Sequence, residues 1–289
     1  MTNDKPAVLC FGEVLWDCMP HGRFVGGAPF NVAYHLTQLG CPAWPVTSVG
    51  NDAPGRALLD QMRSAGVHAE LVGRCADKPT GAVQVTLDHG VPSYDIVDDA
   101  AWDYIDLPDR LPAACQPVAA IVYGSLAQRS THNRRTLRQL LDRGTSALKV
   151  FDVNRRPPFD PATLIWQSAA IADVVKLNDE EAAWLLELDT ASLDFERAAR
   201  RIAARAGCNY VCITGGAEGA GLLVDDVWHR VDATPTVVRD TVGAGDAFLA
   251  ALVHGLLTSP AYPDRLLRNA SRLAAFVAGS DGATPEHTR

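Results

Sequence analysis

The stretch DTVGAGDAF occupies residues 240–248, and it leads into residues 247–257, which are apolar almost throughout. A segment that is apolar on nearly every side predicts a buried helix. Gly243, Ala244 and Gly245 would form the start of this helix, where backbone N–H groups have no partner inside the helix and the dipole is positive. Without bulky side chains, such a helix start suits a closely approaching anion, above all a phosphate.

Asp246 stands at the mouth of this predicted anion site. A carboxylate repels phosphate if it serves only for binding, but it can act as a general base while the helix start stabilises a transferred phosphoryl group. We expect it to be charged at neutral pH, because the N–H groups and the dipole favour the anion. The alternative is an ordinary helix start with a favourable acidic residue, and the nonapeptide alone does not separate the two.

The composition of the 289-residue chain is that of an ordinary soluble globular protein, with 47% hydrophobic and 21% charged residues. A net charge of -8 argues against a general nucleic-acid or membrane surface, which needs a basic patch. The seven cysteines form no CxxC pair and no metal-binding spacing, which is typical of reduced thiols in the cytoplasm. We expect no signal peptide in residues 1–6, and no apolar run approaches the ~20 residues of a membrane span.

A second glycine-rich stretch, GGAPFNVAYHLTQLG, covers residues 26–40. Gly26 and Gly27 allow close backbone approach, and Asn31 falls in the first turn of a predicted helix that ends at Gly40. The Asn31 amide offers both a donor and an acceptor, as neighbouring sugar hydroxyls require. Asp17, just past a predicted first strand, could bind hydroxyls as well. The alternatives are a Gly-Gly turn with a capping asparagine, and a solvated loop carboxylate.

Strand and helix patterns alternate along the chain. Short apolar runs predict strands over residues 7–11, 46–50, 119–123, 148–153, 172–176 and 210–214. Helical patterns cover residues 55–65, 131–141 and 266–279. This alternation implies a mainly parallel sheet with helices on both faces. Residues 80–87 alternate instead, and with the turn His89-Gly90 and residues 93–97 they predict a hairpin exposed on one side.

The two glycine-rich stretches resemble the two signatures of the ribokinase-like (PfkB) carbohydrate kinases, in the family's order. FDVN-x-R, residues 151–156, resembles the fructokinase branch. The resemblance covers nearly all of residues 7–285. It implies one domain over residues 1–289, a ribokinase-like αβα sandwich with a small β lid. Segments near 14–25 and 80–103 would form the lid and exclude water from the acceptor site.

The resemblance also implies roles for individual residues. The catalytic residues would be Asp246 with Gly243, Ala244 and Gly245. The sugar site would consist of Asp17, Gly27, Asn31, Asn154, Arg156 and Asp246. The nucleotide site would consist of Lys176, Asn178, Glu181, Thr214, Gly216, Gly219, Gly245 and Ala283.

Metal sites follow from the same resemblance. Asn178 and Glu181 are three residues apart at a predicted helix start, so one face of the helix could hold the waters of a hydrated Mg²⁺. The alternative is a plain helix cap. Asp240 and Val242, with the C-terminal loop near Ser280, are the expected site of a K⁺ ion.

These features favour ATP-dependent phosphorylation of a hexose, most simply of fructose to fructose 6-phosphate. A nucleoside or other carbohydrate kinase of the same fold is the alternative, with Phe24, Phe30 or Trp102 as a platform for a base. A non-catalytic sugar or nucleotide sensor is a further alternative, but such a protein would gain nothing from a general base at Asp246.

No GxxxxGK[ST] P-loop is present. The expected partners are the sugar and ATP, without nucleic acid or membrane, and the lid hairpin is a candidate surface for a homodimer.

Overall fold

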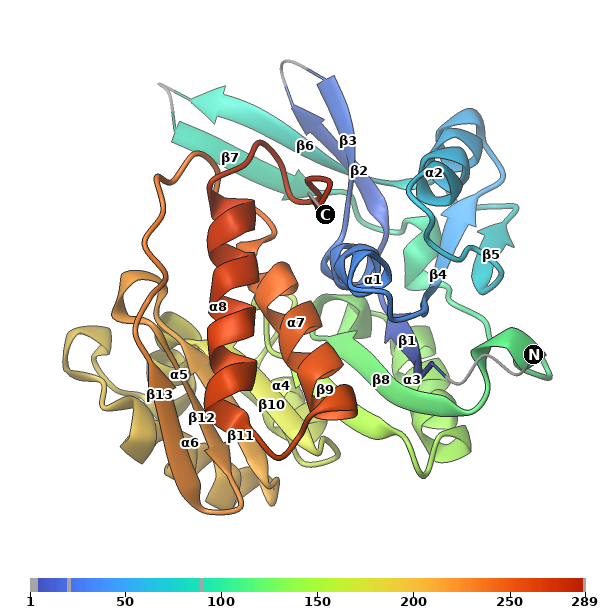
Figure 1. Cartoon of the computed structure of the whole chain (residues 1–289). Coiled ribbons are helices and arrows are strands. Elements are labelled where there is room, and N and C mark those ends of the chain that lie inside the picture. Colours follow the sequence, from blue (N-terminus) through green and yellow to red (C-terminus); the bar gives the residue numbers. More distant parts are fainter. Residues whose placement is uncertain (1–4, 20–21, 89–90, 288–289) are drawn as a thin grey trace.

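The computed structural model describes residues 5–19, 22–88 and 91–287 (Figure 1). Within these residues a nine-stranded sheet has the order β13-β12-β11-β10-β9-β8-β1-β4-β5. All its neighbouring strands are parallel except β11-β12 and β12-β13, which form an antiparallel edge. The strands are β1 (Ala7–Phe11), β4 (Ala43–Gly50), β5 (Val72–Cys75), β8 (Val118–Gly124), β9 (Leu148–Asp152), β10 (Val174–Asn178), β11 (Tyr210–Thr214), β12 (Ala220–Val224) and β13 (Val227–Val231).

Helices cover both faces of this sheet. One face packs against α1 (Ala28–Gln38), α2 (Ala53–Ser64), α7 (Ala244–Thr258) and α8 (Pro263–Ala278). The other face packs against α3 (Thr131–Arg143), α4 (Ala162–Ala169), α5 (Asp179–Leu186) and α6 (Phe195–Ala206). Figure 1 shows α1, α7 and α8 in front of the sheet and α3 to α6 behind it. The predicted αβα sandwich is confirmed.

The first strand illustrates why a parallel sheet forms here. Val8 and Cys10 belong to the core on the α1 and α7 side, whereas Leu9 and Phe11 belong to the core on the α3 side. Side chains of a strand alternate between its faces, so a strand buried on both faces must be apolar throughout. No helix among the described residues is long and apolar enough to cross a bilayer.

A second sheet forms a lid above one edge of the sandwich (Figure 1). Its order is β3-β2-β6-β7, and its strands are β2 (Leu15–Met19), β3 (Gly22–Gly26), β6 (Gly81–Asp88) and β7 (Val91–Ile96). β2 follows β1 almost directly, and β3 leads straight into α1 through Gly27. The predicted turn His89-Gly90 lies outside the described residues. The lid is therefore connected to the sandwich at Gly26 and Gly27, where the glycine-rich stretch of residues 26–40 leads into helix α1.

Asp17 lies in lid strand β2, within the segment near residues 14–25 that was predicted to form the lid, and it pairs there with Phe24 and Val83. The alternative of a solvated loop carboxylate is excluded. The elements over residues 72–75, 162–169 and 195–206 were not among the predicted ones. The first two are short, and the third is a strongly amphipathic helix whose pattern was missed.

Candidate active site

The start of α7 lies at the carboxyl edge of the main sheet, where open α/β sheets bind ligands. Helix α7 begins at Ala244, and its N-cap Gly243 has the left-handed φ of 78°. A Cβ atom at Gly243 would lie 2.6 Å from the Cβ of Ala283, so the C-terminal segment closes against the helix start. Ala244 donates its N–H to Thr241 O at 3.2 Å. Gly245 and Asp246 follow in the first turn, whose N–H groups lack intrahelical partners.

One hydrogen bond joins the two glycine-rich stretches. Asn31 donates its Nδ2 to Asp246 Oδ2 at 2.8 Å, and the two residues are 215 positions apart. Both side chains are buried, and the exposed fraction of Asp246 is only 9%. The second amide atom, Asn31 Oδ1, is buried without a hydrogen-bond partner among the described residues. Because a buried polar atom needs a partner, Asn31 Oδ1 fits the hydroxyl of a ligand.

Asp17 reaches the same place from the lid. A Cβ atom at Gly26 would lie 1.9 Å from Asp17 Oδ2, so only glycine leaves room for this carboxylate. Gly27 is equally restricted, because its Cβ would lie 2.5 Å from Glu13 O at a φ of 108°. The glycine pair therefore packs against the site and is not only a turn.

A small cavity at the carboxyl ends of β1, β8 and β9 adjoins these side chains. Polar lining comes from Glu13, Ser125, Asp152, Asn154 and Arg156. Asn154 has a φ of 36°, a conformation that asparagine tolerates better than most residues. The positive charge of Arg156 lowers the pKa values of Glu13, Asp17 and Asp246, although burial outweighs this effect in each case.

The pKa values of these carboxyl groups are raised, chiefly by burial. Desolvation raises the pKa of Asp17 to about 6 and that of Glu13 to about 7, in each case against the lowering effect of Arg156. Burial also raises the pKa of Asp246, whereas Asn31, Lys176 and Arg156 lower it. The dipole argument predicts a shift in the opposite direction, because it leaves out the cost of desolvation. A pKa moved toward neutrality makes a carboxylate a better general base.

Lys176 lies beneath the helix start. Its Nζ is 3.0 Å from Asp152 Oδ1, and the two residues are direct neighbours across β9 and β10. Burial alone would lower the pKa of Lys176, but Asp152, Glu181 and Asp246 raise it, so the ammonium stays charged. A Cβ atom at Gly245 would lie 3.3 Å from this Nζ. A fixed positive charge thus reinforces the anion site from below.

Asn178 and Glu181 form a capping box at the start of α5. Asn178 Oδ1 accepts from Glu181 N at 2.7 Å, and Glu181 Oε2 accepts from Asn178 N at 2.8 Å. Glu181 Oε1 also accepts from Arg155 N at 2.7 Å, which ties α5 to the loop that carries Arg156. The capping alternative is therefore present, and the role of the pair toward Mg²⁺ stays a prediction.

The remaining residues predicted to bind nucleotide or K⁺ lie in two turns, one after β11 and one before α7. Thr214 ends β11, and Gly216 and Gly219 have φ values of 53° and 84° in the turn that follows. A Cβ at Gly219 would lie 2.2 Å from Val231 O, so this glycine is required by the hairpin itself. Asp240 Oδ1 accepts from Val242 N at 3.0 Å in the turn before α7. Their roles toward ATP and K⁺ stay predictions.

Two of the expected aromatic platforms are excluded. Trp102 and Phe30 are buried, with exposed fractions of 0% and 3%, and cannot stack on a base. Phe24 on β3 is 49% exposed. The correction has a simple cause: aromatic residues near a binding motif belong to the core more often than to the site.

Three residues near the site were missed from the sequence. Glu13 follows β1, and its Oε1 accepts from Ala28 N at the start of α1. Asp152 ends β9 beside Lys176. His35 on α1 contacts Ala283 O through its Nε2 at 3.0 Å and thereby holds the C-terminal segment. A carboxylate at the end of a buried strand is the sequence signal that could have identified the first two.

Comparison with known proteins identifies the family of this chain. A family model described as pfkB family carbohydrate kinase matches residues 7–289. A fructokinase of Rhizobium leguminosarum bv. trifolii is 31% identical over 267 residues, which cover 86% of this chain and 79% of the relative. A fructokinase of Klebsiella pneumoniae is 30% identical over 288 residues, which cover 94% of this chain and 90% of the relative.

Solved structures agree with the sequence relatives. An uncharacterized sugar kinase from Pyrococcus horikoshii has a TM-score of 0.83 and 26% identity, and the match covers 96% of this chain and 93% of the other. The same protein in complex with ATP has a TM-score of 0.82 at 26% identity and covers 96% of this chain and 94% of the other. Since the family model matches nearly the whole chain, this protein belongs to the pfkB family of carbohydrate kinases and is an ATP-dependent sugar kinase.

Proposed function

We propose that the protein transfers the γ-phosphoryl group of ATP to fructose and forms fructose 6-phosphate. The observation that carries the proposal is the contact of Asn31 with Asp246, since it joins the amide proposed to bind the sugar to the carboxylate proposed as general base. Asn154 and Arg156, from the fructokinase-like segment, line the adjoining cavity. Two relatives at 30% identity or more are fructokinases.

In this mechanism Asp246 accepts the proton of the acceptor hydroxyl. The hydroxyl oxygen forms a bond to the γ-phosphorus as the bond to the ADP oxygen breaks. The N–H groups at the start of α7 and the Lys176 ammonium stabilise the negative charge in transit. Asp17 and Asn31 orient the sugar through its hydroxyl groups.

Mg²⁺ would supply charge neutralisation on the ATP phosphates. Asn178 and Glu181 fit an ion that keeps several of its waters, because their donor set is one amide and one carboxylate. Asp240 and Val242 belong to the segment proposed to hold K⁺ beside the α7 start. The seven cysteines are all free thiols, which fits a reducing cytoplasm.

The lid also has two outer strands, β3 and β7, in its described residues. We propose that two copies pair through these edges, since an exposed edge strand is a template for pairing. Sedimentation analysis of the purified protein decides this proposal: a dimer is expected, and a monomer at assay concentration would contradict it.

A panel of acceptors tests the substrate. The protein, with ATP and Mg²⁺, should phosphorylate fructose faster than ribose, adenosine or inosine in an assay coupled to ADP formation. Turnover should fall when Mg²⁺ is chelated and rise when a bulky organic cation is replaced by K⁺. Preference for a nucleoside would refute the fructose assignment, and equal rates in sodium, potassium and organic salts would remove K⁺ from the account.

Asp17→Ala should raise the KM for the sugar and leave that for ATP nearly unchanged. In the wild type, the ionised carboxylate accepts hydroxyl hydrogen bonds, so the sugar KM should also rise as the pH falls through about 6, the raised pKa of Asp17. The variant should lack this pH dependence. Asp60→Ala, on the exposed side of α2, is the matched control. Equal rises in both KM values would contradict a sugar-binding role.

Asp246→Asn should lower kcat by about 10²–10⁴, the usual contribution of a general base. The amide keeps the shape, and its oxygen can still accept from Asn31, so sugar and ATP should bind with nearly unchanged Kd. The melting temperature should change little, because one lost dipole contact is worth only ~0.3–1 kcal/mol. Near-normal turnover would reject the mechanism, and a collapsed melting temperature would mark Asp246 as a structural residue.

A further inference from the structure

Arg129 is a buried cation that the proposed mechanism does not use. It ends the short 3-10 helix η3 (Leu126–Arg129), which follows Gly124 and Ser125 in the lining of the small cavity beside Asn154 and Arg156. This cavity is part of the proposed sugar site and is called the sugar cavity below. Its side chain is only 8% exposed. A charge removed from water needs strong compensation, so the partners of this guanidinium define what it holds in place.

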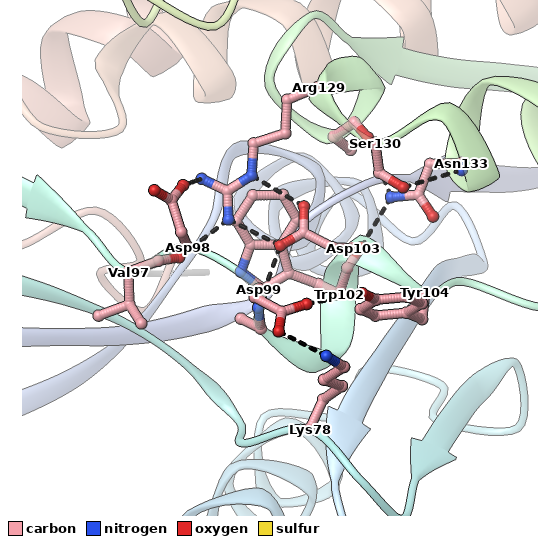
Figure 2. Close-up of polar contacts among 12 residues, drawn as sticks. Lys78, Val97, Asp98, Asp99, Trp102, Asp103, Tyr104, Arg129, Ser130 and Asn133 are labelled. Atoms are coloured by element: carbon pink, nitrogen blue, oxygen red, sulfur yellow. Dashed lines mark hydrogen bonds and ion pairs between the residues drawn. The ribbon is translucent and has the colours of Figure 1, made fainter.

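The guanidinium contacts the point where the chain leaves the lid (Figure 2). Arg129 Nη2 donates to Val97 O at 2.8 Å, and Nη1 lies 3.3 Å from Asp98 Oδ1. Val97 is the first residue after lid strand β7. Asp103 accepts from Nε at 2.8 Å and from Nη2 at 2.7 Å, a bidentate geometry that lysine cannot reproduce.

The same side chain also contacts the point where the chain enters the lid, through Trp102. The guanidinium lies 4.0 Å from the centroid of the Trp102 ring. This indole occupies the space beside Gly81, the first residue of lid strand β6, since a Cβ there would lie 2.4 Å from the ring. The exit from the β6-β7 hairpin thus contacts Arg129 directly, and the entry is linked to Arg129 through Trp102.

A third contact leads to the sugar cavity. The Arg129 guanidinium lies 4.8 Å from the centroid of Phe159. The next residue, Asp160, accepts a hydrogen bond from the backbone N–H of Arg156, which lines the cavity. One buried cation thus joins the lid hairpin, the η3 segment of the cavity wall and the loop that carries Arg156.

From these contacts we propose that Arg129 is a positioning residue, which holds the lid hairpin in register over the sugar cavity. It acts on the reaction through the lid, by keeping sugar in and water out, and touches no reacting atom. The proposal rests on the proposed phosphorylation of a sugar at this cavity. A second ion pair, Lys78 with Asp99, lies near the same connections of the lid. It should stabilise the lid less than Arg129 does, because surface ion pairs are weak.

Arg129→Met and Arg129→Lys test the proposal against a matched control. Arg134→Met is suited as control, because Arg134 donates to Gln128 O and Thr131 Oγ1 and so supports the same segment without reaching the lid. Amide hydrogen exchange across residues 81–97 should accelerate in both Arg129 variants and stay unchanged in the control. This readout does not depend on which sugar is the substrate.

Kinetics supply the second readout. In the Arg129 variants the KM for the sugar should rise by about 10-fold to 100-fold, which is the scale of a mispositioned substrate. The KM for ATP should stay within about twofold of the wild-type value, well below a tenfold step in affinity. The ratio of ADP formed to sugar phosphate formed should exceed one, because water gains access. Asp98→Ala should show the same changes more weakly, because the Asp98 side chain is 80% exposed and removing it should not unfold the protein. This variant keeps the test decisive if Arg129→Met does not fold.

Unchanged exchange in the lid, equal effects of Arg134→Met, or parallel rises in both KM values would each overturn the proposal. A wild-type protein that phosphorylates no sugar would instead refute the proposed function. The exchange measurement would still decide whether Arg129 holds the lid.

Discussion

The site depends on the hydrogen bond between Asn31 Nδ2 and Asp246 Oδ2. Two helix starts that are far apart in the chain must meet for this bond to form, and the sheet brings them together. β1 lies between β4 and β8, so the loop after β1 opens at a switch point of strand order, where α/β sheets have their crevice. Gly26 and Gly27 before α1, and Gly243 before α7, let the two helix starts and the lid approach one another closely enough for this bond to form.

Charge balance follows from this packing. Burial raises the pKa values of the carboxyl groups of Glu13, Asp17 and Asp246, and the positive charge of Arg156 opposes this rise in each case. Asp152 and Lys176 form a separate buried pair below the helix start. In the proposed mechanism, sugar hydroxyls donate to the carboxylates and restore part of the lost hydration, whereas the phosphate contacts the N–H groups and the Lys176 ammonium. In this mechanism, hydroxyl and phosphoryl group would thus meet groups of opposite charge near Asp246.

Much of the fold and part of the site could be predicted from the sequence. The helix start at Gly243 and the strand and helix patterns are set by neighbouring residues, so each could be predicted from its own short segment of the sequence. The contacts of Asp152 with Lys176 and of Arg129 with the lid were not predicted. Both depend on which strands and loops are neighbours in space, and a single sequence segment does not carry that information. The place of Asp17 in the lid followed from the family resemblance and not from its own segment, since β2 is a strand because the lid sheet pairs it.

A double-mutant cycle on Asn31 and Asp246 tests the central claim most directly. kcat/KM for the preferred sugar would be measured for the wild type, Asn31→Ala, Asp246→Ala and the double variant. If the two side chains act as one unit, the double variant should lose little more than Asp246→Ala alone, as expected for strongly coupled residues. Losses that simply add would contradict the account, because they would mean that Asn31 and the base contribute independently.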